Sequence, residues 1–251
     1  LVNAQWTPAQ NLERRLLGPV FPTLDDAALH ARAQVPVTTD RVYGGLILKR
    51  ADGLFVGTLP VITPEEDFDV KWIFPDESVS AGLFPAGCTI VARYRARHAR
   101  EVPVLLSASE KQLYLNMLSV KAVHTAFERG TRTMEEYLFG PDGSVIRYRS
   151  GAWNKVRANL AHALTDFGSL PHDLDAAWVK KRIHEGDLKP SAWVDSLAKN
   201  GYLYVVAGSS VWGAPRLVTD FSLVRQASGD TVPKLPRSEP HYSPVFADGV
   251  A

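Results

Sequence analysis

Two pairs of β-rich runs constrain the fold most strongly, because each pair flanks a short loop that contains Asp-Gly. The first pair is Val42–Leu48 and Leu54–Val61, around residues 49–53, and the second is Tyr137–Phe139 and Val145–Tyr148, around residues 140–143. Asp-Gly between such runs favours a tight β-hairpin. Gly44-Gly45 within the first run indicates a bulge or a close backbone approach. The sequence therefore predicts two antiparallel hairpins, and whether they reflect a duplication stays open.

The other elements follow from helical and alternating spacing. Thr23 and Asp26 form the Asp version of a capping box, which predicts a helix that runs to about Ala33. A second helix is predicted from Ser107 or Ser109, with one face formed by Leu113, Met117, Val120, His124 and Phe127. Further helices are predicted at residues 174–184 and 191–199, the latter closed by Asn200-Gly201, and further strands at residues 68–74, 88–94, 202–207 and 217–224. This order predicts the α+β class, as a mixed α/β sandwich.

The predicted elements group into two domains. We expect an N-terminal arm over residues 1–20, an α+β domain over 21–129, a smaller α+β segment over 130–230, and a tail rich in Pro and Ser over 231–251. A chain of 251 residues that is 45% hydrophobic can bury a substantial core.

Composition excludes several classes of function. The formal net charge is +1, so no global field attracts nucleic acid, and no nucleic-acid partner is predicted. Cys88 is the single cysteine, which excludes an intramolecular disulfide and every multi-cysteine metal cage. No apolar run approaches the length of a membrane helix, and no signal peptide is visible. We expect a cytoplasmic protein, or one that is exported by a non-classical bacterial route.

A basic cluster lies at the end of the predicted strand 88–94. Its members are Arg93, Arg95, Arg97, His98 and Arg100. Alternation along a strand would place Arg93, Arg95 and Arg97 on one face, where guanidinium groups suit phosphate, carboxylate or an acidic partner. The alternative is a solvated strand face that nearby acidic residues neutralise.

Residues 21–128 resemble the JAB/JAMM-like metalloprotease superfamily, and in particular its bacterial branch that accompanies toxin- and secretion-associated proteins. The resemblance is carried by the opening Phe21-Pro-Thr-Leu-Asp-Asp-Ala-Ala28, the first hairpin, the run from Phe84 to Tyr94, and Ser107 with Glu110.

The resemblance implies a site in which the metal ligands are missing. Active members use a Glu on the first hairpin strand, two His and an Asp as zinc ligands, and a supporting Ser, and zinc lowers the pKa of its bound water. The Glu falls near Val42 or Tyr43, the two His at Arg95 and Arg97, the Ser at Ser107 and the Asp at Glu110. Arginine offers donors only and cannot bind zinc. We therefore expect no metal and no cofactor, although His98 could replace one ligand through a register shift.

Three functions remain open from the sequence. The first is a non-catalytic JAB-like binding or scaffold module of a bacterial secretion- or toxin-associated protein. The second is a secreted effector or toxin enzyme with its activity in the C-terminal segment, where His162, Asp166, His172, Asp173, His184 and Glu185 match no known metal cage. The third is an anionic-ligand binder that uses Arg93, Arg95 and Arg97, with His98, Ser107 and Glu110 nearby. The expected partner is a protein or an anionic ligand.

Overall fold

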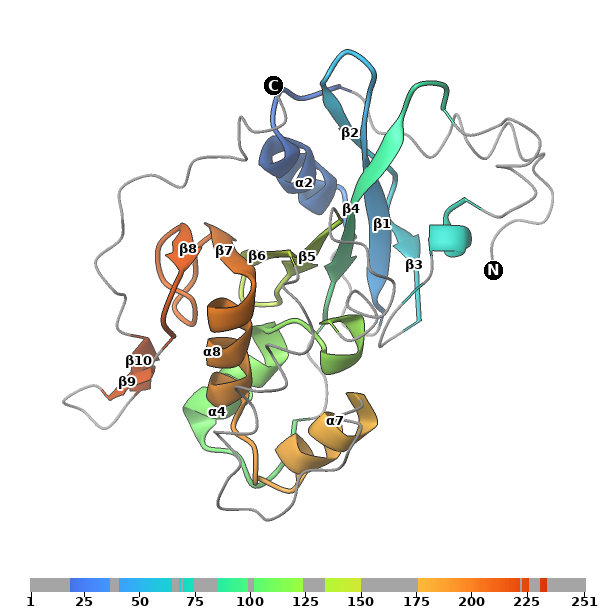
Figure 1. Ribbon diagram of the computed structural model, residues 1–251. Helices are drawn as coiled ribbons and strands as arrows, with labels where there is room; N and C mark the ends of the chain where they lie inside the picture. The colour runs from blue at the N-terminus through green and yellow to red at the C-terminus, as the bar shows by residue number, and fades with distance from the viewer. Residues whose placement is uncertain are drawn as a thin grey trace. The chain divides into compact units, whose positions relative to one another are not determined.

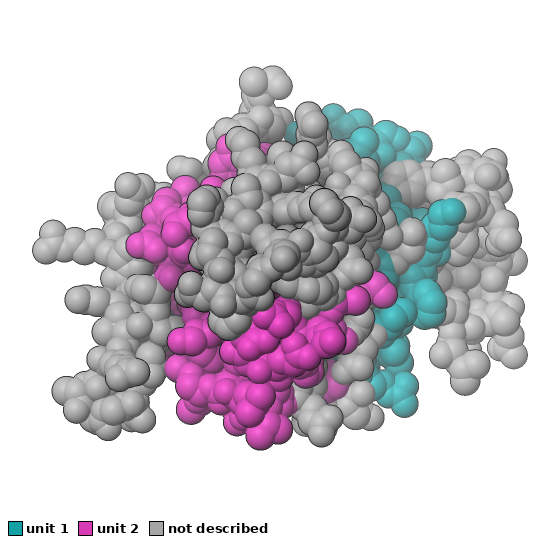
Figure 2. Space-filling model, turned by 60° about the horizontal axis from the view of Figure 1, so that its bottom comes forward, with its two compact units in different colours: residues 1–96, 243–251 teal, residues 97–242 magenta. Residues whose placement is uncertain are grey.

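The computed structural model describes residues 19–36, 41–64, 68, 70–74, 85–98, 102–123, 134–149, 176–221, 223–225 and 231–233. The chain forms two compact units (Figure 2): unit 1 comprises residues 1–96 and 243–251, and unit 2 comprises residues 97–242. This division differs from the predicted boundary after residue 129. The predicted arm and tail fall almost entirely outside the described residues, and the domain limits stay predictions.

Helices and strands occur in both units, and the α+β class predicted from the sequence is confirmed (Figure 1). Unit 1 contains α2 (Leu24–Ala33), β1 (Tyr43–Lys49), β2 (Phe55–Gly57), β3 (Val61–Ile62), a 3-10 helix (Val70–Trp72) and β4 (Thr89–Ala96). Unit 2 contains α4 (Ala108–Asn116), β5 (Glu135–Phe139), β6 (Val145–Arg149), α7 (Ala176–His184), α8 (Pro190–Asn200), β7 (Tyr202–Ala207), β8 (Arg216–Val218), β9 (Leu223–Arg225) and β10 (Thr231–Pro233). None of the described helices has the length and apolar character that crossing a bilayer requires.

The sheet of unit 1 is built around β1, which pairs antiparallel with β2, β3 and β4. The predicted hairpin is confirmed, because β1 and β2 join through Asp52 and Gly53, and Gly53 has a φ of 83° that suits glycine. Helix α2 contacts β1 and β2. Its predicted cap is also confirmed, since the Thr23 side chain accepts a hydrogen bond from the backbone N–H of Asp26.

Gly45 lies where a neighbouring side chain approaches the backbone of β1. A Cβ atom at this position would overlap the Tyr94 ring. Tyr94 is fully buried, and its hydroxyl donates a hydrogen bond to the Thr58 carbonyl, which fixes the ring in place. The close backbone approach predicted from Gly44-Gly45 is therefore confirmed.

The predicted strand over residues 68–74 is wrong. The chain instead forms a 3-10 helix over Val70–Trp72, with the N–H groups of Ile73 and Phe74 bonded to the Val70 carbonyl. Phe68, Ile73 and Phe74 are nonetheless buried in the core of unit 1. A short apolar run indicates burial, and this burial is achieved by a helical turn here.

The sheet of unit 2 is an antiparallel series in the order β5, β6, β7, β8. The second predicted hairpin, β5–β6, is confirmed. One face of this sheet carries Leu138, Ile146, Leu203 and Val218 into a core shared with the helices. Helix α8 contacts both β7 and α4, as Figure 1 shows. The core also contains Trp193 and Trp212, each almost completely buried.

Three predicted element ends differ from the structure. Helix α4 ends at Asn116, because Met117 adopts an extended conformation, although Leu113, Met117 and Val120 are buried as predicted. Gly201 is extended rather than left-handed at the end of α8. The single strand predicted over residues 217–224 is divided into β8 and β9. Strand β9 pairs with β10, which lies in the predicted tail. His124 and Phe127 lie outside the described residues.

Candidate functional site

The predicted site residues Ser107 and Glu110 lie at the start of α4. Ser107 is the N-cap, and its Oγ accepts a hydrogen bond from the backbone N–H of Glu110. The Glu110 side chain is buried and contacts the start of α8. One carboxylate oxygen accepts the backbone N–H of Ser191 at 2.8 Å, and the other accepts the Ser191 hydroxyl. Glu110 therefore caps the first turn of a neighbouring helix.

Helix α8 requires such a cap from outside its own sequence. Its N-cap residue, Lys189, makes no side-chain capping bond, and Pro190 occupies the first turn. The first N–H groups of a helix lack partners within the helix and carry partial positive charge. A carboxylate that accepts one of these N–H groups supplies the missing hydrogen-bond partner and places negative charge next to the partial positive charge. The position that the resemblance assigns to a zinc-binding Asp is thus used to join α4 to α8.

Arg93 and Arg95 lie on β4 and are 1% and 5% exposed. Arg93 Nη1 donates to the Phe68 carbonyl at 2.6 Å, and the guanidinium lies over the Phe68 ring. Arg95 Nη2 donates to the Pro64 carbonyl at 2.7 Å. The alternative of a solvated strand face is therefore wrong for these two residues, because both are buried. Both arginines attach the chain that follows β3 to the sheet of unit 1.

Arg97 belongs to unit 2 and caps the other end of α4. Its Nη1 donates to the carbonyls of Tyr114 and Met117, at 3.2 and 2.6 Å, and the residue is 8% exposed. Carbonyls at a helix C-terminus lack partners within the helix, and arginine commonly bonds to them. His98, next in the chain, is half-buried, and its Nδ1 has no hydrogen-bond partner in the part of the chain that the structure describes. Arg100 lies outside that part.

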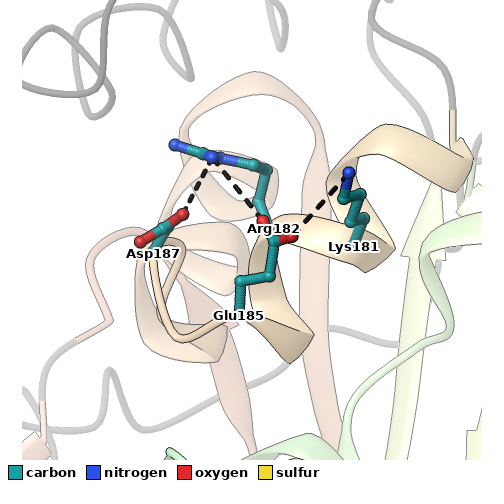
Figure 3. Close-up of polar contacts among 4 residues, drawn as sticks. All are labelled: Lys181, Arg182, Glu185 and Asp187. Carbon is teal, nitrogen blue, oxygen red and sulfur yellow. Dashed lines mark ion pairs between the residues drawn. The ribbon is translucent and has the colours of Figure 1, made fainter.

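Glu185, one of the candidates near the end of α7, belongs to a set of ion pairs with Lys181, Arg182 and Asp187 (Figure 3). The Arg182 guanidinium lies 2.8 Å from the Asp187 carboxylate and 3.6 Å from that of Glu185, which also lies 3.8 Å from Lys181. The Arg182 carbonyl accepts the N–H groups of Asp187 and Leu188, so this set stabilises the turn between α7 and α8. His184 Nε2 lies 3.4 Å from the Tyr114 hydroxyl.

No metal centre is formed by the residues that the structure describes. Among them, no group of three or more His, Cys, Asp or Glu side chains is placed to hold an ion. His162, Asp166, His172 and Asp173 lie outside the described residues. Val42 and Tyr43, at the position of the family's acid/base Glu, are on or next to β1.

Burial shifts the pKa of several ionisable side chains in the direction that favours the neutral form, and Tyr94 and Arg216 are two of them. Burial raises the pKa of the Tyr94 phenol well above its usual range, and the hydrogen bond to the Thr58 carbonyl only partly opposes this shift. Burial lowers the pKa of the Arg216 guanidinium. Arg216 donates to the carbonyls of Trp212 and Ala214, so it stabilises the loop before β8. Both groups serve packing.

Sequence reasoning missed two residues that organise unit 2. Ser191 is the partner of Glu110, and its only local signal is its position in the first turn of a predicted helix. Asn116 joins three segments: its side-chain oxygen accepts the N–H of Asp142 in the β5–β6 loop, and its carbonyl accepts the indole N–H of Trp212. No motif in the sequence marks either contact.

Comparison with known proteins assigns no family. A scan against protein-family models found no match, and a search of curated proteins found none either. The JAB-like resemblance stays a prediction from the sequence motifs.

Proposed function

We propose that the chain is a non-catalytic binding or scaffold module, JAB-like in its N-terminal part, of a bacterial protein associated with secretion or toxin delivery. The setting rests on the resemblance alone. The proposal that the chain lacks zinc-dependent catalysis rests on the structural roles of Arg95, Arg97 and Glu110. The resemblance assigns these three residues to zinc-ligand positions, and each instead makes hydrogen bonds that connect elements of its own unit.

Zinc chemistry is incompatible with this set of side chains. A catalytic zinc site needs three ligands with lone pairs and one open position for water. Arg95 and Arg97 supply only donors, and one guanidinium nitrogen of each bonds to the main-chain carbonyl oxygens of its own unit. Glu110 supplies a carboxylate, but both of its oxygens accept hydrogen bonds from Ser191. Binding a cation at Glu110 would break the cap of α8.

An anion site on the arginines gains no support from the geometry. The three side chains are between 1% and 8% exposed, and their guanidinium groups bond to carbonyls of their own units. Side chains as buried as these present little guanidinium surface to a phosphate or carboxylate in solution. The arginine cluster therefore supports the structure, and a partner is expected elsewhere.

A loop in unit 2 supports the binding role. Val104 and Leu105 are 84% and 71% exposed, the highest exposures among the large hydrophobic side chains described as exposed. They lie next to each other in the turn before α4, and Leu105 lies against Gly186 in the turn after α7. Full burial of an aliphatic side chain is favourable by about 1.5–3 kcal/mol. A protein partner with an apolar pocket would gain this free energy.

Peptidase assays and cross-linking test the two halves of the proposal. The purified chain should not cleave lysine-linked isopeptide substrates, and neither zinc nor EDTA should shift its melting temperature. Cleavage that EDTA abolishes would contradict the absence of catalysis.

In the source cells, a photo-crosslinking residue at position 105 should form one defined protein adduct. This adduct should be absent when the photo-crosslinking residue replaces the exposed Lys121 instead. Equal labelling at both positions, or none, would contradict the binding surface.

A further inference from the structure

A pocket of about 430 Å³ opens in unit 1 beside the turn between β1 and β2. Its walls include Ala51, Val56, Ala86 and Cys88, with Arg50 and Asp52 among the polar lining. This volume falls within the range of small-molecule sites, which are mostly apolar and contain a few polar groups that orient the ligand. The pocket shares no residue with the surface or the buried contacts that the proposed function uses.

The polar groups of the pocket favour an anionic ligand group over a cationic one. Both carboxylate oxygens of Asp52 have partners. One forms an ion pair with Arg50 at 2.8 Å, and the other accepts a hydrogen bond from the backbone N–H of Leu54. The Arg50 guanidinium has five N–H donors, and one ion pair leaves donors that can bind a further acceptor. A carboxylate is the acceptor that matches a guanidinium best, because two parallel hydrogen bonds can form.

Both rims of the pocket are hydrogen-bonded turns. The Arg50 N–H donates to the Leu54 carbonyl at 2.8 Å, and the Gly53 N–H donates to the Arg50 carbonyl. In the turn that supplies Ala86 and Cys88, the Cys88 N–H donates to the Pro85 carbonyl. A pocket bordered by ordered turns is largely preformed, so a ligand loses little free energy in organising it.

We propose that this pocket binds a small, mainly apolar carboxylate, with its hydrocarbon part against Val56, Ala86 and Cys88 and its carboxylate on Arg50. The ligand class follows from the lining: apolar walls, one cation with available donors, and one anion that is already paired. This site goes beyond the partner-binding role proposed above and does not depend on it.

Cys88 gives a specific measurement of occupancy. It is the only cysteine of the chain and is partly exposed, so a bound molecule would shield the thiol from a small alkylating reagent. Burial raises the pKa of this thiol, while the nearby Arg50 opposes the shift, so alkylation by iodoacetamide is best followed near pH 9. With 10 mM 4-phenylbutyrate, alkylation should slow about fivefold, which corresponds to a millimolar Kd for a ligand of this size. Alkylation of free glutathione under the same conditions provides the baseline.

Two variants with matched controls complete the test. Arg50→Gln should raise the apparent Kd for 4-phenylbutyrate about tenfold, so that 10 mM slows alkylation less than about twofold, and should leave protection by 4-phenylbutanol unchanged. The exposed Arg41→Gln should change neither. Ala86→Leu fills the pocket and should abolish protection, whereas the exposed Ala33→Leu should not. The proposal is overturned if neither compound slows alkylation in the parent protein, or if protection survives Ala86→Leu undiminished. Equal protection by the acid and the alcohol, unaffected by Arg50→Gln, would refute the carboxylate assignment.

Discussion

Glu110 stabilises unit 2 by capping α8, and a double-mutant cycle with Ser191 measures this contribution directly. Glu110→Gln removes the charge from two hydrogen bonds of a buried side chain, whereas Ser191→Ala removes only the hydroxyl and keeps the backbone N–H. Hydrogen bonds to charged groups contribute about 1.5–3 kcal/mol, and a helix cap about 0.5–2 kcal/mol. We expect a loss of about 2 kcal/mol for Glu110→Gln and about 1 kcal/mol for Ser191→Ala.

The two losses should not add. Both variants disturb the hydroxyl–carboxylate bond, so the double variant should be less destabilised than the sum by about 1 kcal/mol. Urea unfolding followed by tryptophan fluorescence measures the cycle, and Glu110→Gln should lower Tm by about 4–8 °C. The control is Glu185→Gln, which alters exposed ion pairs in the same unit and should cost about 0.5 kcal/mol or less. Additive losses, or a Glu110→Gln effect as small as that of the control, would refute the cap.

Three further perturbations test other contacts. Gly45→Ala should destabilise unit 1 by about 2–3 kcal/mol, because the new methyl group overlaps the fixed Tyr94 ring, whereas Gly53→Ala, in open space, should cost about 1 kcal/mol in thermal or urea unfolding. Tyr94 has a raised pKa when folded, so its contribution is fully present below the unfolded pKa of about 10 and is lost as pH rises towards the folded value. Tyr94→Phe should therefore reduce the loss of stability in alkaline titrations, and should cost about 1–3 kcal/mol at neutral pH by leaving the Thr58 carbonyl without this donor. Arg97→Met should cost about 2–4 kcal/mol by freeing the carbonyls at the end of α4, and Lys121→Met, at an exposed position, should cost less than about 0.5 kcal/mol.

Local signals predicted much of the secondary structure. Thr23 and Ser107 were identifiable as helix starts because a cap acts within three residues, and both make the expected bond. The two hairpins were identifiable because a tight turn sets its own register. The same local reasoning failed at residues 68–74, where an apolar run specifies burial without specifying the backbone conformation.

The roles of the site residues could not be predicted, because they depend on contacts distant in sequence. Glu110 and Ser191 are 81 residues apart, and Arg95 bonds to a carbonyl 31 residues earlier. The sequence identified Arg95 as unable to bind zinc, which depends only on the residue type. It could not show that the guanidinium is buried against the main chain instead of presented to solvent. Every residue has a main-chain carbonyl, so the residue type does not indicate which carbonyl accepts a hydrogen bond. Only the folded structure identifies such partners.

The metal content of the purified protein tests the central claim most directly. The full chain, purified without chelators or a metal-binding tag, should contain far less than one zinc per molecule by mass spectrometry. Glu110→Gln should leave that value unchanged while lowering stability. One tightly bound zinc per chain, reduced in the Glu110→Gln variant, would contradict a structural role for this side chain and restore a metal site.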